Sequence, residues 1–215
     1  MSFGIENFDI DLHFSTSVYR INRADLLPAV KPVFDEYVGQ AIANGVDDTY
    51  PGVMTTVMHE DSRMSSLVNY ISEIAWDVLD NQGYDMSLFY TSMHAMWGQN
   101  HPKMSSMDYH NHPNTVLTCF YFIDTPSDSS MLSLYDPRQS KVFSNLPVKQ
   151  DGKPSLAIDS INYTPNPGDI IFTNGWLPHS FSRNRSNIPY NFLHINIGVI
   201  PKQSFDNINS EPVVV

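Results

Sequence analysis

Residues Met107 to Asp124 read MDYHNHPNTVLTCFYFID. The run from Thr115 to Asp124 is rich in aromatic and β-branched residues, which is typical of a buried β-strand. His110 and His112 lie one residue apart just before that run. In an extended chain, side chains two positions apart point to the same face, so both imidazoles can reach one metal ion. The stretch therefore predicts a β-fold with a candidate metal site beside a strand.

A metal site of this kind needs at least one further ligand from elsewhere in the chain. The best candidate is His179 in PGDIIFTNGWLPHSF, where a turn and an apolar strand lead to a histidine at the start of the next strand. Three such ligands can hold one side of a metal ion and leave open positions on the other. Asp108 can reach the same face as His110, so a ligand set with this carboxylate stays an alternative. His101, in the turn-like QNHPK, is expected to be exposed.

The rest of the chain predicts a mainly β protein with N-terminal helices. Apolar residues recur with helical spacing from Asp25 to Gly45, where Pro32 marks a kink or the true start, and again from Leu67 to Gly83. After Ser87 the pattern changes to short strands separated by turn residues. These expected strands are 87–97, 115–124, 130–136, 169–174 and 190–200. Many short strands without intervening helices indicate an antiparallel sandwich or barrel.

Length and composition set further limits. The 215 residues suit one domain, in which 1–85 form a helical support, 86–200 a jelly-roll core and 201–215 a polar tail. The net charge of −11 disfavours nucleic acids and anionic membranes as partners. Cys119 is the single cysteine, which excludes an intramolecular disulfide and favours a reducing compartment. With no signal peptide or apolar spanning segment in view, we expect a cytoplasmic protein.

The order of motifs resembles that of the 2-oxoglutarate/Fe(II)-dependent oxygenase superfamily, and more narrowly a bacterial and phage branch with a His-x-His-Pro motif. The resemblance covers roughly Met86 to Val199 and is carried in order by Trp97, His110, His112-Pro113, Tyr121, Asp136-Pro137-Arg138, Gly168-Asp169, Trp176, His179 and Asn196. It implies a double-stranded β-helix, also called a jelly roll or cupin-like fold. It also implies Fe(II) held by His110, His112 and His179, with 2-oxoglutarate as co-substrate, O₂, and a small-molecule or amino-acid/peptide substrate.

Two positions depart from the usual pattern of that superfamily. His112 stands where a carboxylate ligand is usual, which leaves the metal centre one charge unit more positive. Tyr190 stands where an arginine commonly anchors the far carboxylate of 2-oxoglutarate through a bidentate pair. Tyr190, His194 and Asn196 alternate on one face and can offer uncharged partners instead, and Arg183 is close enough in sequence to substitute.

Two more residues are weighed as partners of the co-substrate. Tyr121 would present its hydroxyl to it if its strand face lines the barrel interior. Arg138 is another candidate, although pairing with Asp136 in a turn is the better expectation.

The resulting functional hypothesis is an oxygenase that hydroxylates an unidentified substrate while 2-oxoglutarate is oxidatively decarboxylated to succinate. One alternative is a cupin-like three-histidine metal dioxygenase that does not use 2-oxoglutarate, which the missing arginine favours and the preserved motif order opposes. The other is a non-catalytic jelly-roll binding protein.

Overall fold

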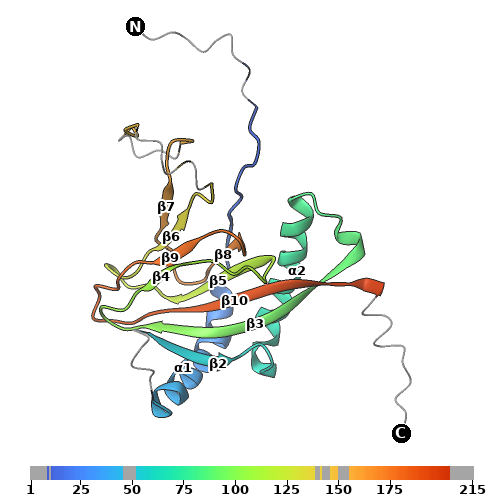
Figure 1. The fold of residues 1–215 in the computed structure, drawn as a ribbon. Helices are drawn as coiled ribbons and strands as arrows, with labels where there is room; N and C mark the ends of the chain where they lie inside the picture. The colour runs from blue at the N-terminus through green and yellow to red at the C-terminus, as the bar shows by residue number, and fades with distance from the viewer. Residues whose placement is uncertain are drawn as a thin grey trace.

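The computed structural model describes residues 9, 11–45, 52–138, 141, 146–149 and 155–203. Ten strands in this part of the chain form two antiparallel sheets that face each other (Figure 1). The large sheet has the order β1 (Tyr19–Asn22), β8 (Asp169–Asn174), β5 (Leu117–Asp124), β10 (Tyr190–Pro201), β3 (Phe89–His101) and β2 (Val53–Val57). The small sheet has the order β4 (Met107–His110), β9 (His179–Phe181), β6 (Leu132–Tyr135) and β7 (Ser160–Tyr163).

This strand order is that of a double-stranded β-helix, because the chain alternates between the two sheets from β3 to β6 and again from β7 to β10, with β6 and β7 paired in the small sheet. β4 returns to the large sheet as β5, and β8 crosses back to the small sheet as β9. The predicted fold class is thereby confirmed: the protein is mainly β, with helices near its N-terminus. The division into 1–85, 86–200 and 201–215 stays a prediction, and most of the expected tail lies outside the described residues.

Two helices cover the outer face of the large sheet. They are α1 (Leu27–Ala43) and α2 (Ser65–Asn81), and short 3-10 turns stand at Ala24–Leu26, Ser62–Met64 and Met86–Leu88. Pro32 lies inside α1, which starts a turn earlier at Leu27 with Pro28 in its first turn. Both helices end near a glycine in the left-handed region, Gly45 and Gly83, as the sequence predicts. The first 85 residues also supply β1 and β2, so they are more than a helical support.

β5 separates two apolar cores, because its side chains alternate between its faces. Cys119 and Tyr121 face the helices, whereas Phe120 and Phe122 face the small sheet. A strand buried on both faces reads as a continuous apolar run, and this is why Thr115 to Asp124 looked uniform in sequence. The inner core between the sheets is made by Phe120, Phe122, Leu132, Leu134, Ile171, Leu177, Phe181, Tyr190 and Phe192.

His101 corrects the expectation of an exposed turn. β3 extends further than predicted and ends at this residue, whose side chain is fully buried. Its ring meets Phe192 and Phe181 edge-on, with centroid distances of 5.2 and 5.8 Å. Burial in this apolar core lowers the pKa of His101 to about 4. The local sequence QNHPK suggested a turn, but pairing with Tyr190 of β10 keeps the chain extended.

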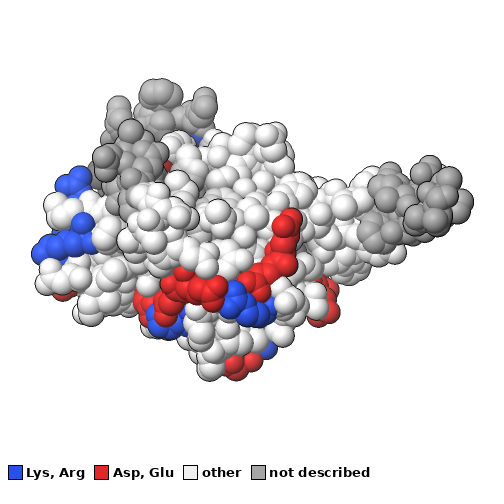
Figure 2. Space-filling model, turned by 90° about the horizontal axis from the view of Figure 1, so that it is seen from below, with Lys and Arg blue, Asp and Glu red and all other residues white. Residues whose placement is uncertain are grey.

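The surface on the helix side carries many acidic groups. Figure 2 shows a row of Asp and Glu side chains on this face, with basic side chains between and beside them. Arg63 pairs with Glu36 and Asp61, both at 2.7 Å, and Lys31 pairs with Asp124 at 2.6 Å. Within the described residues, no helix is long and apolar enough to cross a membrane.

Candidate metal centre

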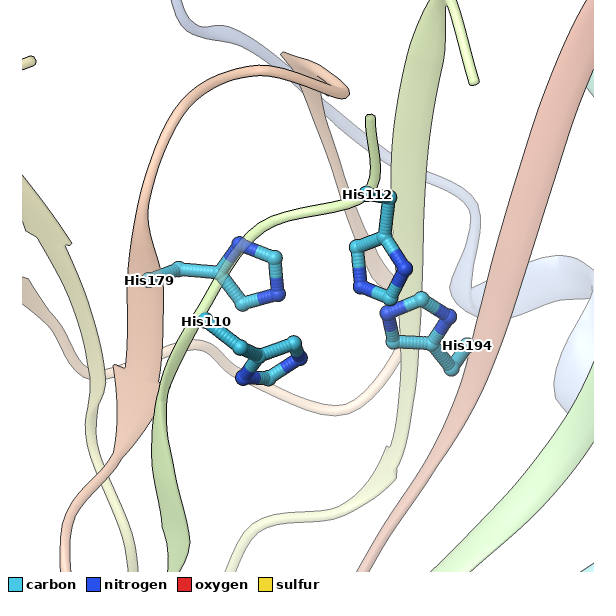
Figure 3. A group of neighbouring side chains, drawn as sticks. All are labelled: His110, His112, His179 and His194. Atoms are coloured by element: carbon cyan, nitrogen blue, oxygen red, sulfur yellow. The ribbon is translucent and has the colours of Figure 1, made fainter. Parts of the chain in front are cut away.

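Four histidines from both sheets converge between them (Figure 3). His110 ends β4 and His179 begins β9, both in the small sheet, and His112 lies in the loop that leads from β4 to β5. His194 comes from the middle of β10 in the large sheet. One nitrogen from each ring lies within 4.8 Å of the corresponding nitrogen of every other ring. A single ion between the sheets could therefore contact nitrogens from several of these side chains.

Strand pairing and one close backbone contact position the first three rings. His110 lies opposite His179 in the β4–β9 ladder, with their ring centroids 4.4 Å apart. His112 is placed by its backbone N–H, which donates to the carbonyl of Gly175 at 2.8 Å. A side chain at Gly175 would meet the carbonyl oxygen of Thr115 at 2.0 Å, so only glycine allows this approach. His112 therefore lies in a loop rather than on a strand, and alternation alone does not explain why it faces the cluster.

Backbone carbonyls fix the tautomers of two rings. The Nδ1–H of His110 donates to the carbonyl of Asp108 at 2.7 Å, and that of His179 donates to the carbonyl of Leu177 at 3.1 Å. A carbonyl can only accept, so both Nδ1 atoms carry the proton and both Nε2 atoms keep a free lone pair. This is the usual way in which proteins orient histidines that bind metals. The Nε2 atoms of His112 and His179 are buried and have no hydrogen-bond partner in the part of the chain that the structure describes.

The surroundings keep the imidazoles of His112, His179 and His194 neutral. Burial lowers the pKa of His112 to about 4, with a further contribution from the nearby charge of His110. Burial also lowers the pKa of His179 to about 3, again helped by His110. His194 is buried completely and its pKa lies well below the ordinary value, for the same reason. Neutral imidazole is the form that binds a metal, so at neutral pH these side chains are ready to do so.

The candidate ligand cluster contains no carboxylate. Asp108 is exposed, and its contact with His110 uses the backbone oxygen rather than the side chain. Among the described residues, the group that could hold an ion consists of the four histidines alone. The residues present thus fit a nitrogen-binding metal such as iron, zinc, copper or nickel.

Tyr121 is not part of this site, which corrects the expectation that its hydroxyl faces a co-substrate. It lies on the helix side of β5, and its hydroxyl donates to the backbone carbonyl of Arg23 at 2.9 Å. Its neighbour Phe120 faces the cluster instead, 5.2 Å from the ring of His179 and 5.0 Å from that of His194. The alternation in the sequence correctly places neighbouring side chains on opposite faces of β5. It does not tell which of the two faces is the inner one.

Tyr190 and Arg183 come together, but at some distance from the histidines. Both line a polar surface pocket of about 500 Å³ that also includes Arg185. Phe192 stands between Tyr190 and His194 along the inner face of β10, and its ring stacks on that of Phe181 at 4.4 Å. The hydroxyl of Tyr190 is buried without a partner. Arg138 forms the expected turn pair with Asp136, at 2.6 Å.

Asn196 belongs to a polar row that lies next to the histidine cluster on the large sheet. It pairs across strands with Thr118, which in turn pairs with Thr173. The side-chain oxygens of all three residues are buried and lack a partner, as does the indole N–H of Trp97. Asn196 was predicted from the sequence as a site residue, whereas Thr118 and Thr173 were not. The only sign of the two threonines in the sequence is a hydroxyl group within an otherwise apolar strand.

Part of the chain is similar to a known protein family. Residues 95–190 match the family model described as "Putative 2OG-Fe(II) oxygenase". A search of curated protein sequences gave no match.

Solved structures share the fold at low sequence identity. AviO1 from Streptomyces viridochromogenes has 11% identity and a TM-score of 0.62, covering 85% of this chain and 90% of its own. A prolyl-4-hydroxylase from Pseudomonas putida has 12% identity and a TM-score of 0.56, covering 85% and 92%. HygX from Streptomyces hygroscopicus, solved with nickel, 2-oxoglutarate and hygromycin B, has 13% identity and a TM-score of 0.57, covering 87% and 84%.

The match to the 2OG-Fe(II) oxygenase family thus covers a little under half of the chain, and the described residues share the double-stranded β-helix of these solved structures.

Proposed function

We propose that this protein hydroxylates a small-molecule or amino-acid/peptide substrate, using Fe(II) held by His110, His112 and His179. The observation that carries the proposal is the convergence of these rings, two of which have their Nδ1–H bonded to a backbone carbonyl and their Nε2 free. When bound, the iron and 2-oxoglutarate supply the oxidation by O₂, with succinate and CO₂ as by-products. The protein's own residues bind, orient and shield the reactants.

The unpartnered polar groups beside the cluster supply uncharged contacts for a carboxylate. The indole N–H of Trp97 and the hydroxyls of Thr118 and Thr173 can each donate a hydrogen bond, and none has a partner among the described residues. In the superfamily pattern an arginine does this with a permanent charge. Here both arginines near Tyr190, Arg183 and Arg185, are exposed at the surface. We therefore propose that Trp97 and the threonines anchor 2-oxoglutarate, in place of Tyr190 and Arg183.

Charge balance makes the three-imidazole set compatible with this co-substrate. Two imidazoles and a carboxylate leave Fe(II) with a net charge of +1, whereas three imidazoles leave it at +2. The charge of −2 on 2-oxoglutarate neutralises the charge of +2 on the three-imidazole centre completely. Burial strengthens this attraction, because charges interact more strongly where water is excluded. The aromatic core of Phe120, Phe181 and Phe192 excludes water on the inner side.

Solvent reaches the cluster from the side of β4. His110 and His112 are partly exposed, whereas His179 and His194 are buried. A substrate would therefore approach from the His110 side and stand over the metal.

Formation of succinate tests the proposal. Protein prepared without metal and then loaded with Fe(II) should convert 2-oxoglutarate to succinate in the presence of O₂, and substitution of His112 by alanine should remove this activity. Succinate can be quantified by NMR. The His101→Phe variant is the control, because it changes a buried histidine outside the cluster. Iron-loaded protein that forms no more succinate than metal-free protein would contradict the proposal.

A further inference from the structure

We infer that the polar pocket at Tyr190 binds the phosphate group of a small molecule through Arg183 and Arg185. This pocket of about 500 Å³ lies between the loop 125–131, which follows β5, and the segment that carries the two arginines. The described residues that line it include none of the four clustered histidines. The inference therefore goes beyond the proposed function, and it can be tested without a metal.

The two arginines of the pocket differ from the other arginines of the chain. The sequence has six arginines. Outside the pocket, three pair with a carboxylate and the fourth lies over the ring of Tyr163, 5.4 Å from its centroid. Arg183 and Arg185 line the same pocket, and neither forms an ion pair with a described residue. Two guanidinium groups that share a pocket repel each other, so an anion between them would be strongly attracted.

The segment that carries these arginines is fixed in place by Asn184, which stands between them and is fully buried. The side-chain amide of Asn184 donates to the carbonyl of His101 at 2.8 Å, and its oxygen accepts from the backbone N–H of Ser186 at 2.9 Å. The backbone from which both guanidinium groups reach the pocket is thus held before any ligand binds. A pre-formed site loses less conformational entropy on binding.

The loop 125–131 forms the opposite wall and is joined to the arginine segment by hydrogen bonds. Ser182 and Met131 exchange two of them, at 3.0 and 2.8 Å, and the backbone N–H of Arg185 donates to the carbonyl of Asp128 at 3.2 Å. Asp128 is exposed, and it is the one acidic residue among the described residues that line the pocket. Positive charge therefore exceeds negative charge there, although the whole chain has a net charge of −11.

Two buried hydroxyls of the pocket lack a partner. Tyr190 is 0% exposed and Ser130 is 3% exposed, and neither hydroxyl oxygen has a hydrogen-bond partner among the described residues. Tyr190 is also the one residue of the inner aromatic core that lines this pocket. Burial raises the pKa of Tyr190 well above its ordinary value, so the hydroxyl keeps its proton and can donate. Buried polar groups nearly always have a partner, and an oxygen of a bound anion would supply it.

A phosphate group matches these donors better than a single carboxylate. It presents three acceptor oxygens around one atom and carries a charge of about −1.5 to −2 at neutral pH, so it can accept from two guanidinium groups and a hydroxyl at once. The pocket volume lies within the range of small-molecule sites, about 300–1,000 Å³. The remaining space is lined by further hydroxyls, those of Thr125, Ser127, Ser129 and Thr164.

Isothermal titration calorimetry of protein prepared without metal tests the inference, with inorganic phosphate and glycerol phosphate as probes. We expect one saturable site per chain for both probes, with glycerol phosphate bound at least as tightly as inorganic phosphate. A preference for inorganic phosphate would contradict the assignment to a larger molecule. Failure of both probes to bind would overturn the inference, and so would displacement of phosphate by 2-oxoglutarate, because the pocket would then belong to the co-substrate.

Variants of the charged residues identify the site. Arg183→Gln and Arg185→Gln should each lower the affinity for phosphate at least about tenfold, because each removes hydrogen bonds from a charged donor. Asp128→Asn should raise the affinity, since it removes a negative charge, and asparagine tolerates the φ of 57° at this position. Arg63→Gln, the same exchange on the helix side, is the control and should leave the affinity unchanged. Both pocket-arginine variants binding phosphate as tightly as the wild type would contradict the inference.

The Tyr190→Phe variant tests the buried hydroxyl separately. It keeps the ring in the aromatic core and removes the unpartnered oxygen, so the variant should melt at the same temperature as the wild type or higher. Its affinity for phosphate should fall several-fold. A variant that melts well below the wild type yet binds phosphate equally well would show that the hydroxyl serves the fold instead of the ligand.

Discussion

Replacement of His179 by alanine is expected to lower the affinity for Fe(II) by more than about 100-fold and to abolish succinate formation. Removing a group that merely supports a metal ligand costs about 10–100-fold, and His179 is itself a proposed ligand. It is fully buried, its Nε2 is free, and its orientation is fixed by the carbonyl of Leu177. No other described side chain can take its place, because the cluster contains only the four histidines. An anaerobic titration with Fe(II) measures the affinity.

His101→Ala is the matched control for this variant. His101 and His179 are both fully buried in the inner barrel, and both pack against phenylalanine rings. Both substitutions therefore leave a hole of similar size and should destabilise the fold comparably, by a few kcal/mol. Only the loss of His179 should affect iron. Affinities of the two variants within about threefold of each other would remove His179 from the metal site.

The metal-free protein is expected to lose stability steeply as the pH falls below about 6.5. The pKa values of His101 and His179 in the folded protein lie at about 4 and about 3, because burial disfavours the charged form. In the unfolded chain both titrate near 6.5. Between about pH 6.5 and pH 4 the unfolded state binds protons that the folded state does not, so the free energy of unfolding decreases as pH falls. Each of these two groups contributes up to about 1.4 kcal/mol per pH unit in that window.

Urea unfolding of the metal-free protein at pH 7, 6 and 5 measures this effect. The His101→Phe variant should show a shallower dependence than the wild type, since one of the buried histidines is then absent. An acidic residue changes the free energy of unfolding in a lower pH range. Asp61, whose pKa is lowered to about 2 mainly by Arg63, affects it only below about pH 4. Equal free energies of unfolding at pH 7 and pH 5 would show that these histidines are not held neutral by the fold.

Local patterns in the sequence predict the elements that carry their own signal. The helices from Leu27 and Ser65 follow from apolar spacing, and β5, β8 and β10 follow from long apolar runs bounded by turn residues. His179 at the first position of β9 is also a local prediction, because the turn residues before it define where the strand begins. The fold class follows from these elements together. How these elements are arranged in space was predicted from the resemblance to the oxygenases, because no single stretch of sequence specifies it.

The features that depend on contacts between distant residues could not be predicted in this way. β4 and β7 are too short to stand out, and β7 is only partly buried. The inner face of β5 is decided by which side the helices cover, and this separates Phe120 from Tyr121. His101 becomes buried through pairing of β3 with β10. His112 faces the cluster because of a contact with Gly175, which lies far away along the chain.

The polar row of Thr118, Thr173 and Asn196 also could not be predicted from the sequence. Thr118, Thr173 and Asn196 come from three strands and become neighbours only through the register of the large sheet. Each one alone looks like an isolated polar residue in an apolar strand. The missing arginine was visible in the sequence, but the groups that we propose in its place become neighbours only in the folded structure.

The assignment of the histidine cluster as the iron and 2-oxoglutarate site is tested most directly by visible absorption under anaerobic conditions. Protein loaded with Fe(II) and then mixed with 2-oxoglutarate should develop the charge-transfer band of an iron centre chelated through two atoms of a 2-oxo acid. The band should persist in His101→Ala and disappear in His179→Ala. Wild-type protein that binds Fe(II) yet develops no such band with 2-oxoglutarate would contradict the assignment.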